Sequence, residues 1–133
     1  MSNYDDELVY SFLVTSDSFE EAFPVTSEFF EGAIEHIEVH GWTQGREVDH
    51  LGHVCAVGAL RRTTLRSLSL SFAVDQPKVH AYVLQIHNSK IMELMGIGDY
   101  SSIPSWNDGP RRTREEVIDA FTRAAKTLRD QGR

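Results

Sequence analysis

The chain has 133 residues, of which 41% are hydrophobic and 25% are charged, and its formal net charge at pH 7 is −7. This length and composition indicate one globular domain with one core, and they exclude two independent cores and wholesale disorder. No apolar run approaches the about 20 residues of a membrane helix, and the first residues lack the basic and apolar stretches of a signal peptide, so we expect no membrane association and a cytoplasmic location.

The N-terminal segment has an acidic start followed by a β-branched and aromatic stretch. We expect residues 1–7 to be flexible and residues 8–14 to form a strand, because such side chains favour strands. A second strand is expected at residues 67–74, where Leu, Phe and Val alternate with Ser and Ala at the period of a half-buried strand. The two segments would pair as a small antiparallel sheet, since a lone strand leaves its backbone hydrogen bonds unmade.

Helical spacing begins at residues 27–40. Thr26 or Ser27 is the expected N-cap, and Gly41 is placed to end the helix. The apolar residues of this helix follow the i, i+3, i+4, i+7 template; they are Phe30, Ala33, Ile34 and Ile37. A short helix is expected within residues 53–62, where Gly58 costs about 1 kcal/mol relative to Ala. Either that helix is short or a neighbour packs closely at Gly58.

The second half of the chain predicts two more helices. One begins after Asp75 with Pro77 in its first turn and ends at Gly96; its apolar residues are Val79, Val83, Ile86 and Met92 or Leu94. Residues 97–112 have the composition of a loop. The last helix, residues 114–130, follows a capping box and has an apolar stripe; these residues are Thr113, Glu116, Val117, Phe121, Ala124 and Leu128.

Together these elements predict an α+β fold that is predominantly helical. We expect three to four helices around one core, with a small two-stranded antiparallel sheet made by residues 8–14 and 67–74. An all-α fold is the alternative. The whole chain, residues 1–133, is expected to form a single globular domain.

Three short segments taken together carry a resemblance to a known family. They are HGWTQG at 40–45, CAVGALRR at 55–62 and SIPSWNDGPRRTREEVIDAFTRAAK at 102–126. In this combination the chain resembles a family of small uncharacterised proteins of actinobacteria and their phages. The resemblance implies a compact, mostly helical domain of phage or actinobacterial origin and brings no activity. The N-terminal 25 residues and residues 65–74 depart from the pattern, and a function peculiar to this protein would lie there.

The motif residues are types that build turns, caps and packed aromatic contacts. Trp106 can bury a large ring, and Asn107 and Asp108 are turn formers whose side chains bond nearby amides. We therefore expect a structural clasp here rather than a reactive loop. The residues to which we assign a structural role are Trp42, Gly58, Trp106, Asn107, Asp108, Thr113 and Glu116.

A cysteine–histidine hydrolase is one alternative function. Cys55 would be the nucleophile, with His53 or His50 as its base and Asn107 or Asp108 as the group that orients the imidazole. A single thiol in an apolar segment is more often a buried core residue, and that is the reading we prefer. As the chain's single cysteine, Cys55 has no partner for an internal disulfide, which suits a reducing compartment.

A metal-stabilised interaction domain is a second alternative. Four imidazoles fall within eighteen residues, and zinc accepts such a ligand set; they are His36, His40, His50 and His53. Recognised zinc sites usually have tighter signatures with Cys or Glu, and solvated histidines are common on an acidic helix face. We therefore expect no metal and no cofactor.

Charge is divided unevenly between the two halves of the chain. Residues 1–60 hold twelve Asp or Glu and one Arg, and residues 61–133 hold eight Asp or Glu and twelve Lys or Arg, so the net charges are −11 and +4. Two basic clusters offer binding residues for phosphate or an acidic partner: Arg61, Arg62 and Arg66, and then Arg111, Arg112 and Arg114. Pairing with the acidic half is the simpler expectation. The acidity of the whole domain argues against nucleic-acid binding.

These patterns favour a non-enzymatic phage or actinobacterial accessory protein that binds another macromolecule, with a protein as the expected partner. The hydrolase and the metal-stabilised domain remain alternatives. Self-association is a further option if the edge of the alternating segment is left unpaired, and it would give a homodimer.

Overall fold

A computed structural model of the chain describes residues 25–67 and 77–133. These residues form five helices, which are α3 (Ser27–His40), α4 (Ala56–Ser67), α5 (Pro77–Met95), α6 (Ile103–Asn107) and α7 (Arg114–Asp130). In the ranges described, no helix is both long enough and apolar enough to cross a bilayer.

The predicted α+β fold is wrong, and the all-α alternative fits. The described ranges contain no strand, only two isolated bridges that join Val54 to Trp42 and to Val48. Of the two expected strands, residues 8–14 lie outside the described residues, as does 67–74 except for Ser67, which ends α4. An alternating pattern gives the period that a strand would have, but it does not show that a partner strand exists. The expected flexibility of residues 1–7 also lies outside the described residues.

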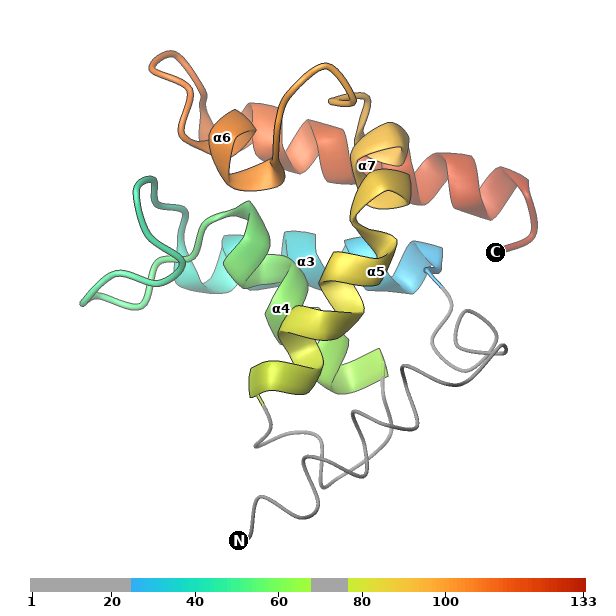
Figure 1. Cartoon of the computed structure of the whole chain (residues 1–133), viewed down its shortest axis with the longest axis horizontal. Helices are drawn as coiled ribbons and strands as arrows, with labels where there is room; N and C mark the ends of the chain where they lie inside the picture. Colours follow the sequence, from blue (N-terminus) through green and yellow to red (C-terminus); the bar gives the residue numbers. More distant parts are fainter. Residues whose placement is uncertain (1–24, 68–76) are drawn as a thin grey trace, which may run out of the picture.

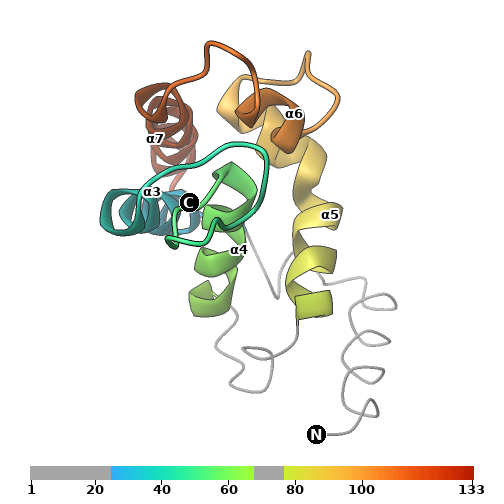
Figure 2. The same cartoon turned by 90° about the vertical axis from the view of Figure 1, so that its left-hand side faces the viewer.

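The helices form two antiparallel pairs that lie one in front of the other (Figure 1). α3 and α7 run in opposite directions at the back of this view, and α4 and α5, which also run in opposite directions, lie in front of them, with α4 between α3 and α5 (Figure 2). Figure 2 looks along α3 and α7 and shows α4 beside α3. The chain between α3 and α4 and the chain between α6 and α7 lie at the same end of the molecule.

Local signals at the helix ends explain where the helices begin and stop. Gly41 ends α3 with φ 91° and donates its N–H to the carbonyl of Ile37 at 2.8 Å, a conformation that favours glycine. Thr26 is the N-cap of α3, without a side-chain hydrogen bond. The predicted capping box is confirmed, because Thr113 and Glu116 satisfy each other's backbone N–H groups.

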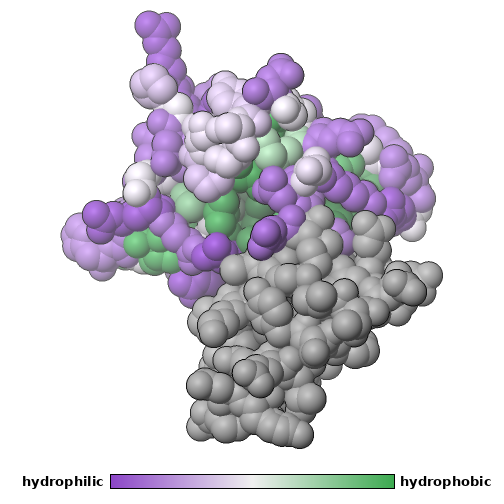
Figure 3. All heavy atoms as spheres, in the orientation of Figure 1, coloured by the Kyte–Doolittle hydropathy of each residue, from purple (hydrophilic) through white to green (hydrophobic). Residues whose placement is uncertain are grey.

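One core joins the described helices. The predicted apolar stripes of α3 and α7 are confirmed: Phe30 and Phe121 are fully buried, with ring centroids 6.0 Å apart. The other large apolar side chains that are fully buried in the described part are Ile37, Val54, Leu60, Ile91, Met95, Val117 and Leu128. In the view of Figure 3, hydrophilic residues cover the ends of the described part and hydrophobic surface shows between them. The prediction of one domain for residues 1–133 includes residues beyond this core and stays a prediction.

Candidate functional site

The three motif segments of the sequence meet at the side chain of Asn107, which is fully buried. Its Oδ1 atom accepts hydrogen bonds from the indole N–H of Trp42 at 2.8 Å and from the backbone N–H of Ala56 at 3.0 Å. Its Nδ2 atom donates to the carbonyl of Thr43 at 3.1 Å and to Oδ1 of Asp108 at 3.0 Å. We call this contact the clasp. It satisfies the first N–H of α4 from a residue 51 positions away, so it supplies part of the capping of that helix.

Further hydrogen bonds fasten the chain after α3 to the chain after α6. Nε2 of Gln44 donates to the carbonyls of Asn107 and Gly109 at 2.9 and 2.8 Å, and the N–H of Gly45 donates to Asp108 at 2.9 Å. The hydrolase hypothesis assigned Asp108 to orient a catalytic imidazole. In the structure, Asp108 instead helps to join the loop after α3 to the loop after α6.

Arg112 holds the other side of the clasp. Its guanidinium lies 4.5 Å from the centroid of the buried Trp106 ring, and its Nε atom donates to the carbonyl of Trp106 at 2.9 Å. It also donates to the hydroxyl of Tyr100 at 3.0 Å and pairs with Glu116 at 3.4 Å. Arg112 was predicted as a binding residue, and the structure places it in intramolecular contacts.

The thiol of Cys55 lies where an N-cap side chain would lie. Cys55 immediately precedes α4, and its Sγ atom accepts a hydrogen bond from the N–H of Gly58 at 3.4 Å, which is the contact that a capping Ser or Thr makes. Only 5% of the residue is exposed. Burial raises the pKa of the thiol, and the negative charges of Glu47 and Asp108 act in the same direction. A thiol held in this way is a poor nucleophile.

His53, the expected base of the hydrolase hypothesis, is hydrogen-bonded to Asp49. The Nδ1 and Oδ2 atoms lie 2.9 Å apart, and the N–H of His53 also donates to Asp49. Burial raises the pKa of Asp49, but hydrogen bonds from the backbone of His53 and Leu51 and the His53 ring outweigh it, so the pKa lies below its ordinary value. Within the described ranges, no hydrogen bond joins the Cys55 thiol to an imidazole. The structure therefore does not assemble the predicted hydrolase site.

A neighbour packs closely against Gly58, which is one of the two explanations that the sequence offered for a glycine in this helix. A Cβ atom at this position would lie 2.5 Å from the carbonyl oxygen of Glu47 and 3.3 Å from the Cβ atom of Val54. The glycine therefore lets the loop before α4 lie against the helix. α4 also continues to Ser67 and is longer than the sequence predicted.

The basic clusters are partly used within the molecule. Arg61 pairs with Glu47, and the side chain of Arg66 lies outside the described part of the structure. Arg62 and Arg111 are exposed, and no ion pair is found for either among the residues that the structure describes. Arg114 pairs with its neighbour Glu115 at 3.2 Å.

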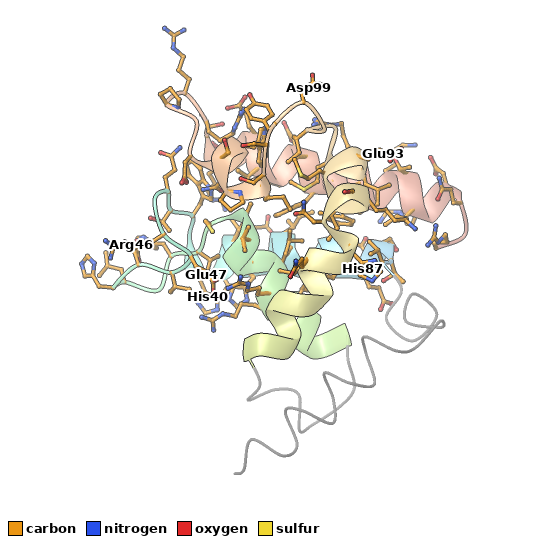
Figure 4. The ribbon with its side chains drawn as sticks, viewed as in Figure 1. His40, Arg46, Glu47, His87, Glu93 and Asp99 are labelled. Atoms are coloured by element: carbon orange, nitrogen blue, oxygen red, sulfur yellow. The ribbon has the colours of Figure 1, made fainter. Side chains whose placement is uncertain are left out.

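A hollow between α3 and α4 brings together candidates that the sequence assigned to different hypotheses. Its volume is about 170 Å³, and its lining residues are Gly32, Glu35, His36, Val39, His40, Arg62 and Thr63. We call it the α3–α4 hollow. The rings of His36 and His40 lie with their centroids 4.3 Å apart, and Val39 is 69% exposed. Figure 4 shows His40 at the end of α3 that lies near the loop carrying Arg46 and Glu47.

The histidines do not form the predicted four-ligand metal set. His36 and His40 lie together, but His53 pairs with Asp49 and His50 is exposed. Across residues 25–67 and 77–133, no group of three or more His, Cys, Asp or Glu side chains is arranged to hold a metal ion.

A family model described as a family of unknown function (DUF6197) matches residues 24–127. The chain belongs to this family. The match to the DUF6197 model includes α3 to α6, the clasp, the α3–α4 hollow and most of α7, and it brings no activity. No curated protein matches the chain, and no solved structure does.

The sequence indicated the residue types of both sites but not their groupings. Gln44 was missed as a residue that supports the clasp, although it lies with Trp42 in the HGWTQG segment on which the resemblance rests. The α3–α4 hollow was missed because His36 and His40 were weighed only as metal ligands or as solvated histidines of an acidic helix face, and Arg62 as part of a separate basic cluster. The packing of α3 on α4 is what joins them.

Proposed function

We propose that this protein is a non-enzymatic accessory protein that binds a partner protein through the α3–α4 hollow. The observation that carries the proposal is the exposure of Val39 and Arg62 beside a concave surface, while the predicted clasp and hydrolase residues make intramolecular contacts. Arg is enriched in protein interfaces, and a partner that contacts Arg62 could also cover Val39.

A phage or actinobacterial origin and a cytoplasmic location are part of the proposal. The origin is supported by the resemblance carried by GWTQG, CAVGAL and IPSWND. The location is supported by a single cysteine, which suits a reducing compartment. The acidity of the chain argues against nucleic acid as the partner.

Site-specific photocrosslinking tests the proposed surface. A photoreactive phenylalanine analogue is introduced at Val39 in one protein and, as a matched control, at the exposed Lys126 of α7 in another. After irradiation in a lysate of the source cell, we expect a discrete product from position 39 that is missing from position 126. The yield of this product should fall by about tenfold when the protein also carries R62E, because the substitution reverses the charge of a residue at the rim of the contact.

Two outcomes would contradict the proposal. The same products from both positions would mean that the label reports only accidental collisions. A discrete product from position 39 that R62E leaves unchanged would mean that the hollow is not the contact surface.

A further inference from the structure

We propose that the α3–α4 hollow binds a phosphoryl group, and that this binding takes up protons at the imidazole pair of His36 and His40. The inference rests on the proposed function in one respect, since it names the chemical group that the partner would present at the same surface.

The geometry provides cationic donors from two helices. His36 and His40 come from consecutive turns of α3 with ring centroids 4.3 Å apart, and Arg62 comes from α4 across the hollow. The guanidinium fork matches the oxygens of a phosphoryl group, and protonated imidazoles donate charge-assisted hydrogen bonds to them. A water molecule's share of liquid volume is about 30 Å³, so a hollow of about 170 Å³ has room for a tetrahedral oxyanion.

The charges around the imidazole pair make anion binding in the α3–α4 hollow depend on the protonation of the two imidazoles. Glu35 lines the hollow on α3 and balances the charge of Arg62 on α4. On the adjoining loop, the side chain of His53 lies against Gly41 and is paired with Asp49, and Glu47 is paired with Arg61. Among the described lining residues, the carboxylate of Glu35 and the guanidinium of Arg62 carry opposite charges. Each proton that the pair binds adds one positive charge.

A doubly charged ligand suits this pair better than a singly charged one. Two imidazolium rings 4.3 Å apart would repel each other, and an anion between them would offset that repulsion. An anion with two charges offsets both imidazolium groups. The second pKa of a phosphoryl group is about 6 and that of an ordinary imidazole is about 6.5, so the dianion and the imidazolium both predominate between about pH 6 and pH 6.5.

Linkage fixes the direction of the pH dependence. An anion stabilises the charged imidazolium, so it raises the imidazole pKa, and the same coupling makes the anion bind more tightly as pH falls. Sulfate is the probe for this dependence because it keeps two charges across the range. We expect sulfate to bind about tenfold more tightly near pH 6 than near pH 8, since up to two protons are linked to binding.

The experiment follows the imidazole C–H resonances of the full chain by NMR during pH titration in sulfate and in chloride of the same ionic strength. Sulfate should raise the pKa of His40, and R62Q and H40Q should each weaken sulfate binding by about tenfold, the loss of one charge-assisted contact. R111Q is the matched control because Arg111 is an exposed cation that does not line the hollow, and it should leave binding unchanged. Inorganic phosphate and N-acetyl phosphoserine amide separate a free ligand from one carried by a protein.

Each result bears on the inference alone. A His40 pKa that sulfate leaves unmoved, or an affinity for sulfate that R62Q leaves unchanged, overturns the inference. If acetate binds as tightly as sulfate, the preference for a doubly charged anion is wrong. If phosphate binds and the phosphoserine derivative does not, the proposal that a partner protein carries the phosphoryl group is wrong. Crosslinking from Val39 requires no anion, so a discrete crosslinked partner without sulfate binding would remove this inference and leave the proposed function standing.

Discussion

Replacing Asn107 by Ala tests whether the clasp stabilises the fold. The variant N107A removes an acceptor of two hydrogen bonds and a donor of two more, and it leaves the N–H of the buried Ala56 without its partner. A buried donor without a partner costs about 1–3 kcal/mol, and each remaining bond contributes about 0.5–1.5 kcal/mol. Trp42 is only partly buried, so water can replace its bond. We therefore expect the free energy of unfolding to fall by about 3 kcal/mol.

Urea unfolding at pH 7 measures this loss, and both tryptophans of the chain report on it. Trp42 donates to Asn107 and Trp106 precedes Asn107 in the chain, so their fluorescence reports on the clasp while circular dichroism follows the helices. With an m value of about 1.5 kcal/mol per molar urea, the midpoint should fall by about 2 M. K126A is the control. It breaks only an exposed ion pair with Asp130 and should cost less than about 1 kcal/mol.

The variant N107D keeps the shape of the side chain and supplies a second test. Its new carboxylate faces the carbonyl of Thr43 and the carboxylate of Asp108, both of which are acceptors. Its pKa should therefore be higher in the folded chain than in the unfolded chain. The destabilisation should be complete above the folded pKa and should shrink as pH falls toward about 4. A loss of less than about 1 kcal/mol in N107A would refute the reasoning.

Three further predictions concern the loop before α4. G58A should destabilise the fold by about 1–3 kcal/mol in urea unfolding despite the better helix propensity of alanine, because the new methyl group meets the backbone of Glu47; a gain in stability would contradict the close approach. The Asp49 carboxylate has a lowered pKa, so it stabilises the fold above its unfolded pKa of about 3.9. The difference in urea midpoint between the parent and D49N should therefore narrow as pH falls below that value. A difference that does not change with pH would show that ionisation of Asp49 does not contribute to stability. Cys55 should resist alkylation in the folded chain and react rapidly in urea, because burial raises its pKa; equal rates in the two states would place the thiol at the surface.

Sequence patterns predicted the helices better than the contacts between them. α3 and α7 have long apolar stripes with signals at their ends, so their bounds were found at residues 27–40 and 114–130. α6 has five residues, which is too short for helical periodicity to be recognised, and residues 97–112 were therefore predicted as loop. In α5, which has 19 residues, the stop at Gly96 was correct but the burial of Leu84 and Ile91 was not predicted.

The clasp and the hollow show why sites are harder to predict than elements. The clasp was expected from the turn-forming residues around Asn107, but its partners lie 51 to 65 positions away in the chain, and no local pattern identifies them. In the hollow, the spacing of His36 and His40 places them on one face of α3, while only the packing of α4 brings Arg62 to that face.

The pairing of α3 with α7 has a consequence for dividing the polypeptide. These helices come from opposite ends of the described chain, yet their side chains, Phe30 and Phe121 among them, fill the same interior. Cleavage in the exposed turn at residues 98–101 would leave each fragment with an uncovered apolar surface that the other fragment fits. The two fragments should therefore stay unfolded when kept apart and recover their structure when mixed, which would suit this small protein to use as a split reporter.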